Sequence, residues 1–80
     1  MYSYWFENNN SVVFSGQAKT QKEIFSVMDQ YKKSIGITNT CFRLWNEKHR
    51  GKMMSCIDFG SYSEFMYIYP ALNLLEELNQ

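Results

Sequence analysis

The sequence has few of the residues from which catalytic and metal sites are most often built. It contains one histidine, two cysteines and one proline among 80 residues. A catalytic histidine needs an orienting acid and a reacting partner, and the only acid near His49 is Glu47, which we expect to pair with Lys52. A four-ligand zinc site would need added carboxylates, and no glycine-rich phosphate loop is present. The sequence therefore predicts no enzyme, no metal and no cofactor.

Two cysteines are also too few for the disulfide framework of a secreted protein. In the strand pairing expected below, Cys41 and Cys56 are diagonal neighbours with Cβ atoms about 7 Å apart, too far for an unstrained bridge. The N-terminal stretch has no basic region followed by an apolar one, and no apolar run is long enough to cross a membrane. We therefore expect free thiols, a cytoplasmic location and no membrane partner.

Apolar and aromatic side chains are abundant, at 45% and 18% of the residues. This composition argues against disorder, and the length predicts one α+β domain spanning residues 1–80. The formal net charge is zero, which argues against attraction of the whole protein to nucleic acid. All eight basic residues nevertheless lie between Lys19 and Lys52, where only three acids oppose them, so positive charge is concentrated in this segment.

The stretch from Cys41 to Phe59 predicts a β-hairpin, because two strand-like runs flank a polar turn. With His49 and Arg50 at the tip, the expected cross-strand pairs share one face, since successive strand residues alternate between faces. These pairs are Glu47 with Lys52, Trp45 with Met54, Arg43 with Cys56 and Cys41 with Asp58. The opposite face is apolar and is expected to form the core: Phe42, Leu44, Met53, Ile57 and Phe59.

A second hairpin is predicted from the alternation of residues 2–7 and 11–17, with a three-residue loop at Asn8–Asn10. This pairing places Phe6 opposite Val12 and Tyr4 opposite Phe14 on the core face. It also places Trp5 opposite Val13 on the other face.

Between the hairpins, Thr20-Gln21-Lys22-Glu23 is a capping box. The Thr20 hydroxyl is expected to accept a hydrogen bond from the Glu23 amide, and the Glu23 side chain to reach back to the Thr20 amide. Apolar residues follow at helical spacing, and Gly36 is the expected left-handed stop. The sequence therefore predicts a helix over residues 21–35.

After Phe59 two interpretations stay open. Ser61-Tyr62-Ser63-Glu64 is a second capping box and predicts a short helix to Tyr69, whereas the β-favouring residues from Phe65 onward predict a short strand. Pro70 suits the first turn of a last helix over Ala71–Leu78. The expected fold is α+β with the order ββαββα, an antiparallel sheet with helices packed on one face.

Both hairpins place a tryptophan on the face away from their core, together with residue types that are enriched at protein interfaces. The predicted partner-binding residues are Trp5, Val13, Arg43, Trp45 and Met54. The basic residues around the central turn are predicted to make secondary contacts: Lys48, His49, Arg50 and Lys52. The alternative is that residues 61–80 wrap this face and bury both tryptophans.

The run from Ile57 to Phe65, IDFGSYSEF, resembles an Asp-aromatic-Gly-Ser-aromatic-Ser-Glu-aromatic stretch of small uncharacterised accessory (host-takeover) proteins of T4-like phages. The resemblance implies an early phage protein that binds and blocks a host or defence protein in the host cytoplasm. It identifies no target and no binding residue.

We therefore expect a non-enzymatic protein–protein interaction module, which the resemblance would make an inhibitor. The partner is another protein or, in a homodimer, a second copy of the chain. The alternative is a single-stranded nucleic-acid-binding protein, since aromatic side chains beside Arg and Lys on a sheet are the arrangement such proteins use.

Overall fold

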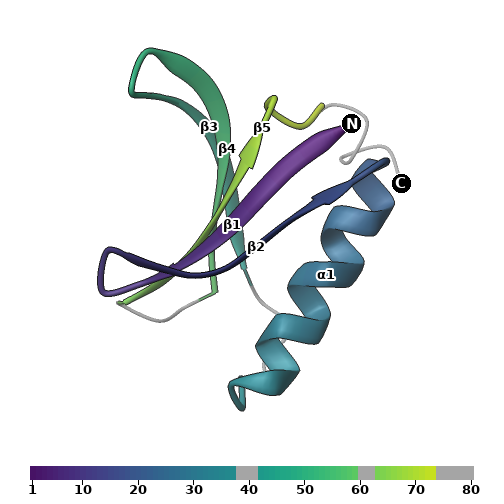
Figure 1. Ribbon diagram of the computed structural model, residues 1–80, viewed down its shortest axis with the longest axis vertical. Coiled ribbons are helices and arrows are strands. Elements are labelled where there is room, and N and C mark those ends of the chain that lie inside the picture. The colour runs from purple at the N-terminus through teal and green to yellow at the C-terminus, as the bar shows by residue number, and fades with distance from the viewer. Residues whose placement is uncertain (38–41, 60–62, 74–80) are drawn as a thin grey trace.

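The computed structural model describes residues 1–37, 42–59 and 63–73. The elements, in chain order, are β1 (Tyr2–Asn8), β2 (Ser11–Ala18), α1 (Gln21–Ser34), β3 (Arg43–His49), β4 (Lys52–Asp58) and β5 (Glu64–Tyr69). The strands form one antiparallel sheet in the order β2-β1-β5-β4-β3, with α1 against one face (Figure 1). We call this the inner face and the opposite one the outer face. The predicted α+β class and antiparallel sheet are confirmed, but the order is ββαβββ, and the predicted ββαββα is wrong.

The element that changes the order is β5, which lies at the centre of the sheet. Tyr67 on β5 faces Trp5 of β1 on one side and Cys56 of β4 on the other. The strand interpretation of this segment is therefore right and the short helix is wrong. In the last predicted helix, residues 71–73 are not helical, and the remainder lies outside the described residues.

Glu64 explains why the second capping box does not start a helix. Its carboxylate accepts hydrogen bonds from Asn8 Nδ2 of β1 (2.7 Å) and from Tyr31 Oη of α1 (2.9 Å). The side chain is 9% exposed, so these two bonds form where water is largely excluded and count for more than at the surface. Hydrogen bonds to residues that are distant in the sequence therefore outweigh the local helix signal of residues 61–64.

The β3–β4 hairpin turns at Arg50 and Gly51, whose φ angles are 53° and 83°. Two positive φ angles are typical of the type I′ turn, whose backbone twist matches the twist of the two strands that it connects. Trp45 then faces Cys56 and Glu47 faces Met54, so the predicted pairing of Glu47 with Lys52 is wrong by two residues. A shift of two residues keeps every side chain on its predicted face.

The β1–β2 hairpin also has a two-residue turn, Asn9-Asn10, with φ angles of 52° and 67°, in place of the predicted three-residue loop. Glu7 faces Val12 but Phe6 faces Phe14, so Val13 is the extra residue of a β-bulge. Trp5 consequently faces Ser15, and the predicted pairing of Trp5 with Val13 is wrong.

The core lies between the inner face and α1. Phe6 is at its centre, with its ring stacked on Tyr31 at a centroid distance of 3.9 Å and on Phe59 at 6.1 Å. Ile24 and Met28 of α1 are 0% and 5% exposed, which confirms the predicted apolar stripe at these positions. The buried core cluster comprises Tyr4, Phe6, Ala18, Ile24, Met28, Ile57, Phe59, Met66, Ile68 and Leu72.

A closed ring of hydrogen bonds holds the segment after β5 against the inner face. The Leu72 amide donates to Ser55 Oγ (2.7 Å), Ser55 Oγ donates to Asn46 Oδ1 (2.5 Å), and Asn46 Nδ2 donates to the Leu72 carbonyl (3.4 Å). Ser55 is fully buried and Leu72 is 3% exposed. Ser55, the one polar residue on the predicted core side of β4, is thus fully used as a donor and an acceptor.

Helix α1 begins at the predicted cap. Thr20 Oγ1 accepts from the Glu23 amide at 3.1 Å, while Glu23 Oε2 accepts from the Lys19 amide at 3.0 Å instead of the expected Thr20 amide. The helix ends at Ser34 with Ile35 as its C-cap; Gly36 follows with a φ of 81°, and the Ile37 amide donates to the carbonyl of Lys32, as in a Schellman motif.

Replacing Thr20 with alanine should lower the free energy of unfolding by about 1 kcal/mol, because the Glu23 amide loses its acceptor. Thr20→Ser keeps an oxygen at the same place and is the matched control. Urea unfolding followed by circular dichroism measures both. An unchanged midpoint in Thr20→Ala would show that Thr20 does not cap the helix.

Ser55→Ala should cost about 1–3 kcal/mol of unfolding free energy, because the buried Leu72 amide loses its acceptor. Ser26→Ala, at an exposed position of α1, should stay within about 0.5 kcal/mol of the wild type. Equal midpoints for the two variants would mean that the ring of hydrogen bonds does not hold this segment in place.

Candidate functional site

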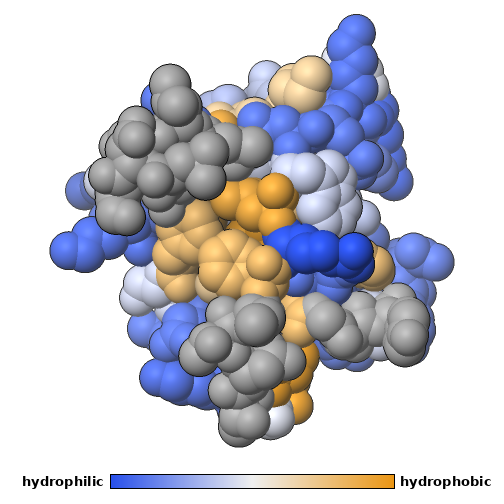
Figure 2. All heavy atoms as spheres, turned by 180° about the vertical axis from the view of Figure 1, so that it is seen from behind, coloured by the Kyte–Doolittle hydropathy of each residue, from blue (hydrophilic) through white to orange (hydrophobic). Residues whose placement is uncertain are grey.

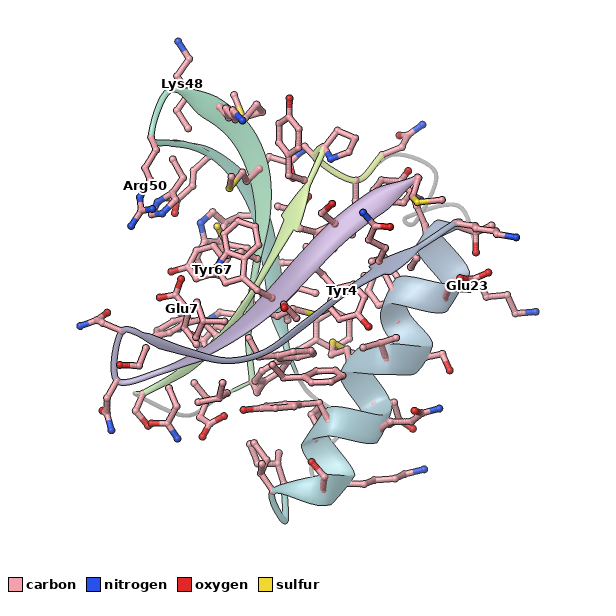
Figure 3. All side chains as sticks on the ribbon, viewed as in Figure 1. Tyr4, Glu7, Glu23, Lys48, Arg50 and Tyr67 are labelled. Carbon is pink, nitrogen blue, oxygen red and sulfur yellow. The ribbon has the colours of Figure 1, made fainter. Side chains whose placement is uncertain are left out.

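The outer face carries a row of side chains that runs across all five strands. The cross-strand pairs place Ser15, Trp5, Tyr67, Cys56 and Trp45 side by side, from β2 to β3. Figure 3 shows Tyr67 on the side of the sheet away from α1 and Tyr4 on the side toward it. The two tryptophans therefore share this face, as the alternation predicts, but Tyr67 and Cys56 separate them.

Aromatic stacking shows that the outer face is concave. Tyr67 stacks on Trp5 with a centroid distance of 5.5 Å and on His49 with one of 5.3 Å. His49 belongs to β3 and Tyr67 to β5, with β4 between them in the sheet. Their rings can meet only because the β3–β4 hairpin curls over the outer face.

The curl creates a hollow of about 710 Å³ between the tips of the two hairpins. The first hairpin contributes Trp5, Glu7 and Val12 to its lining, and the second contributes Arg50, Lys52 and Met54. We call this feature the outer hollow. Its wall combines residues of β1 and β2 with residues of β4, which is distant from them in the sequence, so the hollow exists only in the folded sheet.

The structure brings some of the predicted binding residues together and separates others. Trp5 and Met54 line the outer hollow, although Met54 is only 7% exposed. Trp45 is half-buried opposite Cys56 and does not line it. Val13 is 53% exposed at the bulge, on the edge strand β2, and is also outside the hollow.

Arg43 lies at the far end of β3 and forms an ion pair with Asp58. The predicted accessible surface of Trp5, Val13, Arg43, Trp45 and Met54 is therefore not continuous. The alternative in which the final segment buries both tryptophans also fails for the described residues, since residues 64–69 are a strand of the sheet and both rings stay partly exposed.

Three of the four predicted secondary contacts reach the outer hollow: His49, Arg50 and Lys52. Lys48 is exposed and pairs with Met53, so alternation directs it to the inner side of β3. Among residues 1–37, 42–59 and 63–73 the ion pairs are Lys33 with Asp29 and Arg43 with Asp58. Lys48 and Arg50 at the β3–β4 tip are therefore available to a partner within the part of the chain that is described, whereas Lys52 Nζ lies 5.1 Å from the centroid of the Tyr69 ring.

Sequence reasoning missed Tyr67, Glu7 and Val12. The strand interpretation of residues 65–69 would have placed Tyr67 on the outer face by alternation with buried Met66 and Ile68. Val12 needs the bulge to reach this face, and nothing in the sequence marks the bulge. Glu7 Oε2 accepts from Trp5 Nε1 at 2.8 Å, which fixes the indole at the hollow's floor.

Cys56 has no exposed surface suited to catalysis. Its side chain is 1% exposed, and its thiol donates to Glu47 Oε1 at 3.3 Å. Burial, and then the Glu47 carboxylate, raise the pKa of Cys56 to about 12, so the thiol is protonated at neutral pH. Burial also raises the pKa of the adjacent Tyr67, followed by the charge of Glu7. Cys56 and Tyr67 at the centre of the outer face are thus uncharged at neutral pH, with the carboxylates of Glu47 and Glu7 close by.

In the described residues, no three His, Cys, Asp or Glu side chains gather closely enough to hold a metal ion. Within the described residues, no helix is long and apolar enough to cross a membrane. Comparison with protein-family models, with curated proteins and with solved structures finds no match.

The raised pKa of Cys56 predicts how stability depends on pH. In the unfolded chain this thiol ionises near its ordinary value of 9.0, whereas in the folded protein it stays protonated to about 12. Between pH 9 and 12 unfolding then releases a proton, so the contribution of this thiol to the free energy of unfolding should be constant below pH 9 and fall as the pH rises from 9 to 12. Tyr31, raised from 10.0 to about 12 by burial and by Glu64, acts in the same direction.

Urea unfolding at several pH values measures this dependence, and Cys56→Ala should show a shallower fall above pH 9. In a Cys41→Ser background, the Cys56 thiol should react with a disulfide reagent only as fast as the native protein opens. A fast reaction at neutral pH, or equal slopes for Cys56→Ala and the wild type, would contradict the buried, protonated thiol.

Proposed function

We propose that this chain is a non-enzymatic protein-binding module whose outer hollow receives a segment of a partner protein. The observation that carries the proposal is the hollow itself: two hairpins enclose an apolar floor, with Trp5 and Met54, and place Arg50 and Lys52 at its rim. Trp, Met and Arg are enriched at protein interfaces, where a central apolar pocket surrounded by polar groups carries most of the affinity.

The charges at the rim indicate the chemistry of the partner. Arg50 and Lys52 are exposed, and neither forms an ion pair within the described residues, whereas Glu7 is held by Trp5. A partner segment that places an apolar side chain on the floor and a carboxylate near Arg50 would match the hollow in shape and in charge. We infer that the partner contributes an acidic segment with one apolar anchor.

Single-stranded nucleic acid is the second candidate, and the same cations favour it, because phosphates bind Arg and Lys. Base stacking, however, needs free ring faces. Tyr67 already stacks on Trp5 on one side and on His49 on the other. Glu7 would in addition repel a phosphate backbone that crosses the hollow. The protein partner is therefore favoured.

The proposal that the module is a phage-encoded inhibitor of a host or defence protein rests on the resemblance of residues 57–65 alone. Ile57 and Phe59 are fully buried, Asp58 is paired with Arg43, and Glu64 bonds to Asn8 and Tyr31. These residues serve the packing of the domain. The resemblance therefore does not assign the binding surface.

Trp5→Ala should weaken binding by at least about 2 kcal/mol, roughly thirtyfold, if the outer hollow is the centre of the interface. The partner is first captured from a nuclease-treated cell extract, and its affinity for each purified variant is then measured by calorimetry. Trp45→Ala is the matched control, since Trp45 lies on the same face outside the hollow. A loss in Trp45→Ala without one in Trp5→Ala would place the site elsewhere on the outer face.

Arg50→Glu should weaken binding of the same partner, whereas Lys22→Glu, an equal charge change at an exposed position of α1, should not. A titration with single-stranded oligodeoxythymidine tests the second candidate. If oligonucleotide binds and its affinity falls steeply with salt, while no protein is captured after nuclease treatment, the protein-binding proposal is refuted.

A further inference from the structure

The strand β2 forms one edge of the sheet, and it is uncharged over its whole length, SVVFSGQA. Val12, Val13 and Phe14 are 60%, 53% and 49% exposed. An edge strand presents a row of unpaired backbone N–H and C=O groups, and exposed apolar side chains make such an edge a template for another strand.

The opposite edge of the sheet, β3, is protected against pairing with another chain by charged side chains. β3 carries Arg43, Glu47 and Lys48, all exposed, and charged side chains on an edge oppose pairing with another chain. The two edges of the same sheet therefore differ in chemistry, and only β2 is suited to accept a further strand.

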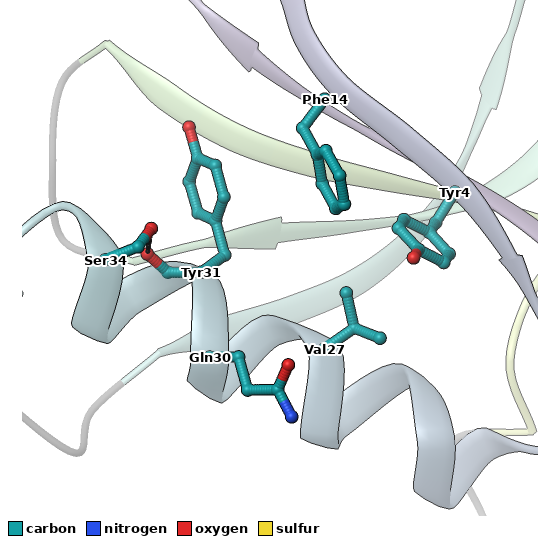
Figure 4. A pocket seen from close by; sticks show the side chains of 6 residues that line it. All are labelled: Tyr4, Phe14, Val27, Gln30, Tyr31 and Ser34. Carbon is teal, nitrogen blue, oxygen red and sulfur yellow. Dashed lines mark hydrogen bonds between the residues drawn. The ribbon is translucent and has the colours of Figure 1, made fainter.

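A second hollow lies beside this edge, between β2 and α1, with a volume of about 440 Å³ (Figure 4). Its lining has no charged side chain and comprises Tyr4, Phe14, Val27, Gln30, Tyr31 and Ser34. Gly16 adds no side chain here, because the Tyr4 ring occupies the space: a Cβ at this position would lie 2.5 Å from Tyr4 Oη. A strand added to β2 would thus bring its own apolar side chains over an open apolar hollow.

The view from behind the molecule shows hydrophobic side chains near its centre and hydrophilic ones mostly around the margin (Figure 2). Exposed apolar side chains are thus not confined to β2. Met53 and Phe42, for example, are 49% and 39% exposed. What distinguishes β2 is the combination of a strand edge that no other described strand pairs with, a lack of charge and an adjacent hollow. The bulge at Val13 leaves Phe14–Ala18 as the regular half of the strand, paired with β1 without interruption.

We propose that β2 pairs antiparallel with β2 of a second copy of this chain, across a two-fold axis perpendicular to the sheet. In such an interface residue i of one copy faces residue j of the other and j faces i, so a residue faces its own like only near the axis. β2 carries no charge, so no register of the pair sets like charges of this strand against each other. The Lys19 residues that follow the strand lie toward opposite ends of the pair, and β2, with Val13 and Phe14 exposed, can therefore pair with its own copy.

The two-fold axis has a consequence for the proposed function. It places both α1 helices on one face of a ten-stranded sheet and both outer hollows on the other. Two hollows that face the same way can engage a partner with two acidic segments at once, and the gain in avidity needs no new contact. The dimer itself does not depend on the proposed function, because its test requires no partner.

The test is sedimentation equilibrium of the whole chain from about 10 μM to about 1 mM, the range of weak association. The variant combines Ser15→Lys with Gln17→Lys, both exposed on the outer face of β2. Every face-aligned antiparallel register whose axis lies within Phe14–Ala18, the regular half of β2, brings these lysines opposite or diagonal to those of the other copy. The control combines Ser26→Lys with Met53→Lys, which adds the same charge at exposed positions on α1 and β4.

We expect the wild type to form a dimer. The dissociation constant of the dimer should rise at least about tenfold in the β2 variant and stay at the wild-type value in the control variant. Amide hydrogen exchange should show β2 amides that are protected at high concentration and exchange faster on dilution. A monomer over the whole range would overturn the proposal. A dimer that the β2 variant leaves intact would overturn it too, and so would a dimer whose protected amides lie on the tryptophan-bearing face instead of in β2. Thermal melts of both variants check that they fold.

Discussion

The structure depends above all on the pairing of β5 with two strands that belong to different hairpins. A two-stranded hairpin is marginally stable on its own in water, and the two hairpins of this chain share no direct pairing. β5 joins them by pairing with β1 on one side and β4 on the other. Its buried residues Met66 and Ile68 face α1 across the core, and Glu64 fixes its start to Asn8 and Tyr31. One short strand thus converts two hairpins and a helix into a single hydrophobic core.

The same strand builds the outer face. Tyr67 alternates with the buried residues of β5 and therefore points away from α1, where it is sandwiched between Trp5 and His49. This stack ties the tip of the β3–β4 hairpin to β1, two strands away from β4. The concavity of the outer face and the stability of the sheet therefore have a common origin, and a change that removed β5 from the sheet would abolish both.

How much the sequence could predict depends on the range of the interactions involved. The helix was predicted within one residue because its cap and stop are local: Thr20 and Gly36 act within one turn. The faces of both hairpins followed from alternation, which survives a register error of two residues. The registers themselves were wrong, because they depend on the φ angles of Arg50 and Asn9, and neither residue type specifies a single turn. β5 was left open because its helix signal is local, whereas one of its two strand partners, β1, is about 60 residues away in the sequence.

The candidate site shows the same limit. Alternation could place Trp5, Trp45 and Met54 on one face, but it could not predict which end of that face would be hollow, since the hollow depends on a stack through Tyr67. It also could not separate Val13 from Trp5, because the bulge leaves Val13 without a residue opposite it and pairs Trp5 with Ser15.

The turn of the second hairpin carries the last step of this reasoning. Both hairpins use two residues of positive φ, and the first uses Asn9 and Asn10, which tolerate this conformation. The second places Arg50 there, although a left-handed residue with a long side chain costs roughly 1–2 kcal/mol relative to an extended one. An asparagine would suit the turn better, so local stability does not account for arginine. At this position the guanidinium lies at the rim of the outer hollow, which supports a role for Arg50 in binding a partner's carboxylate.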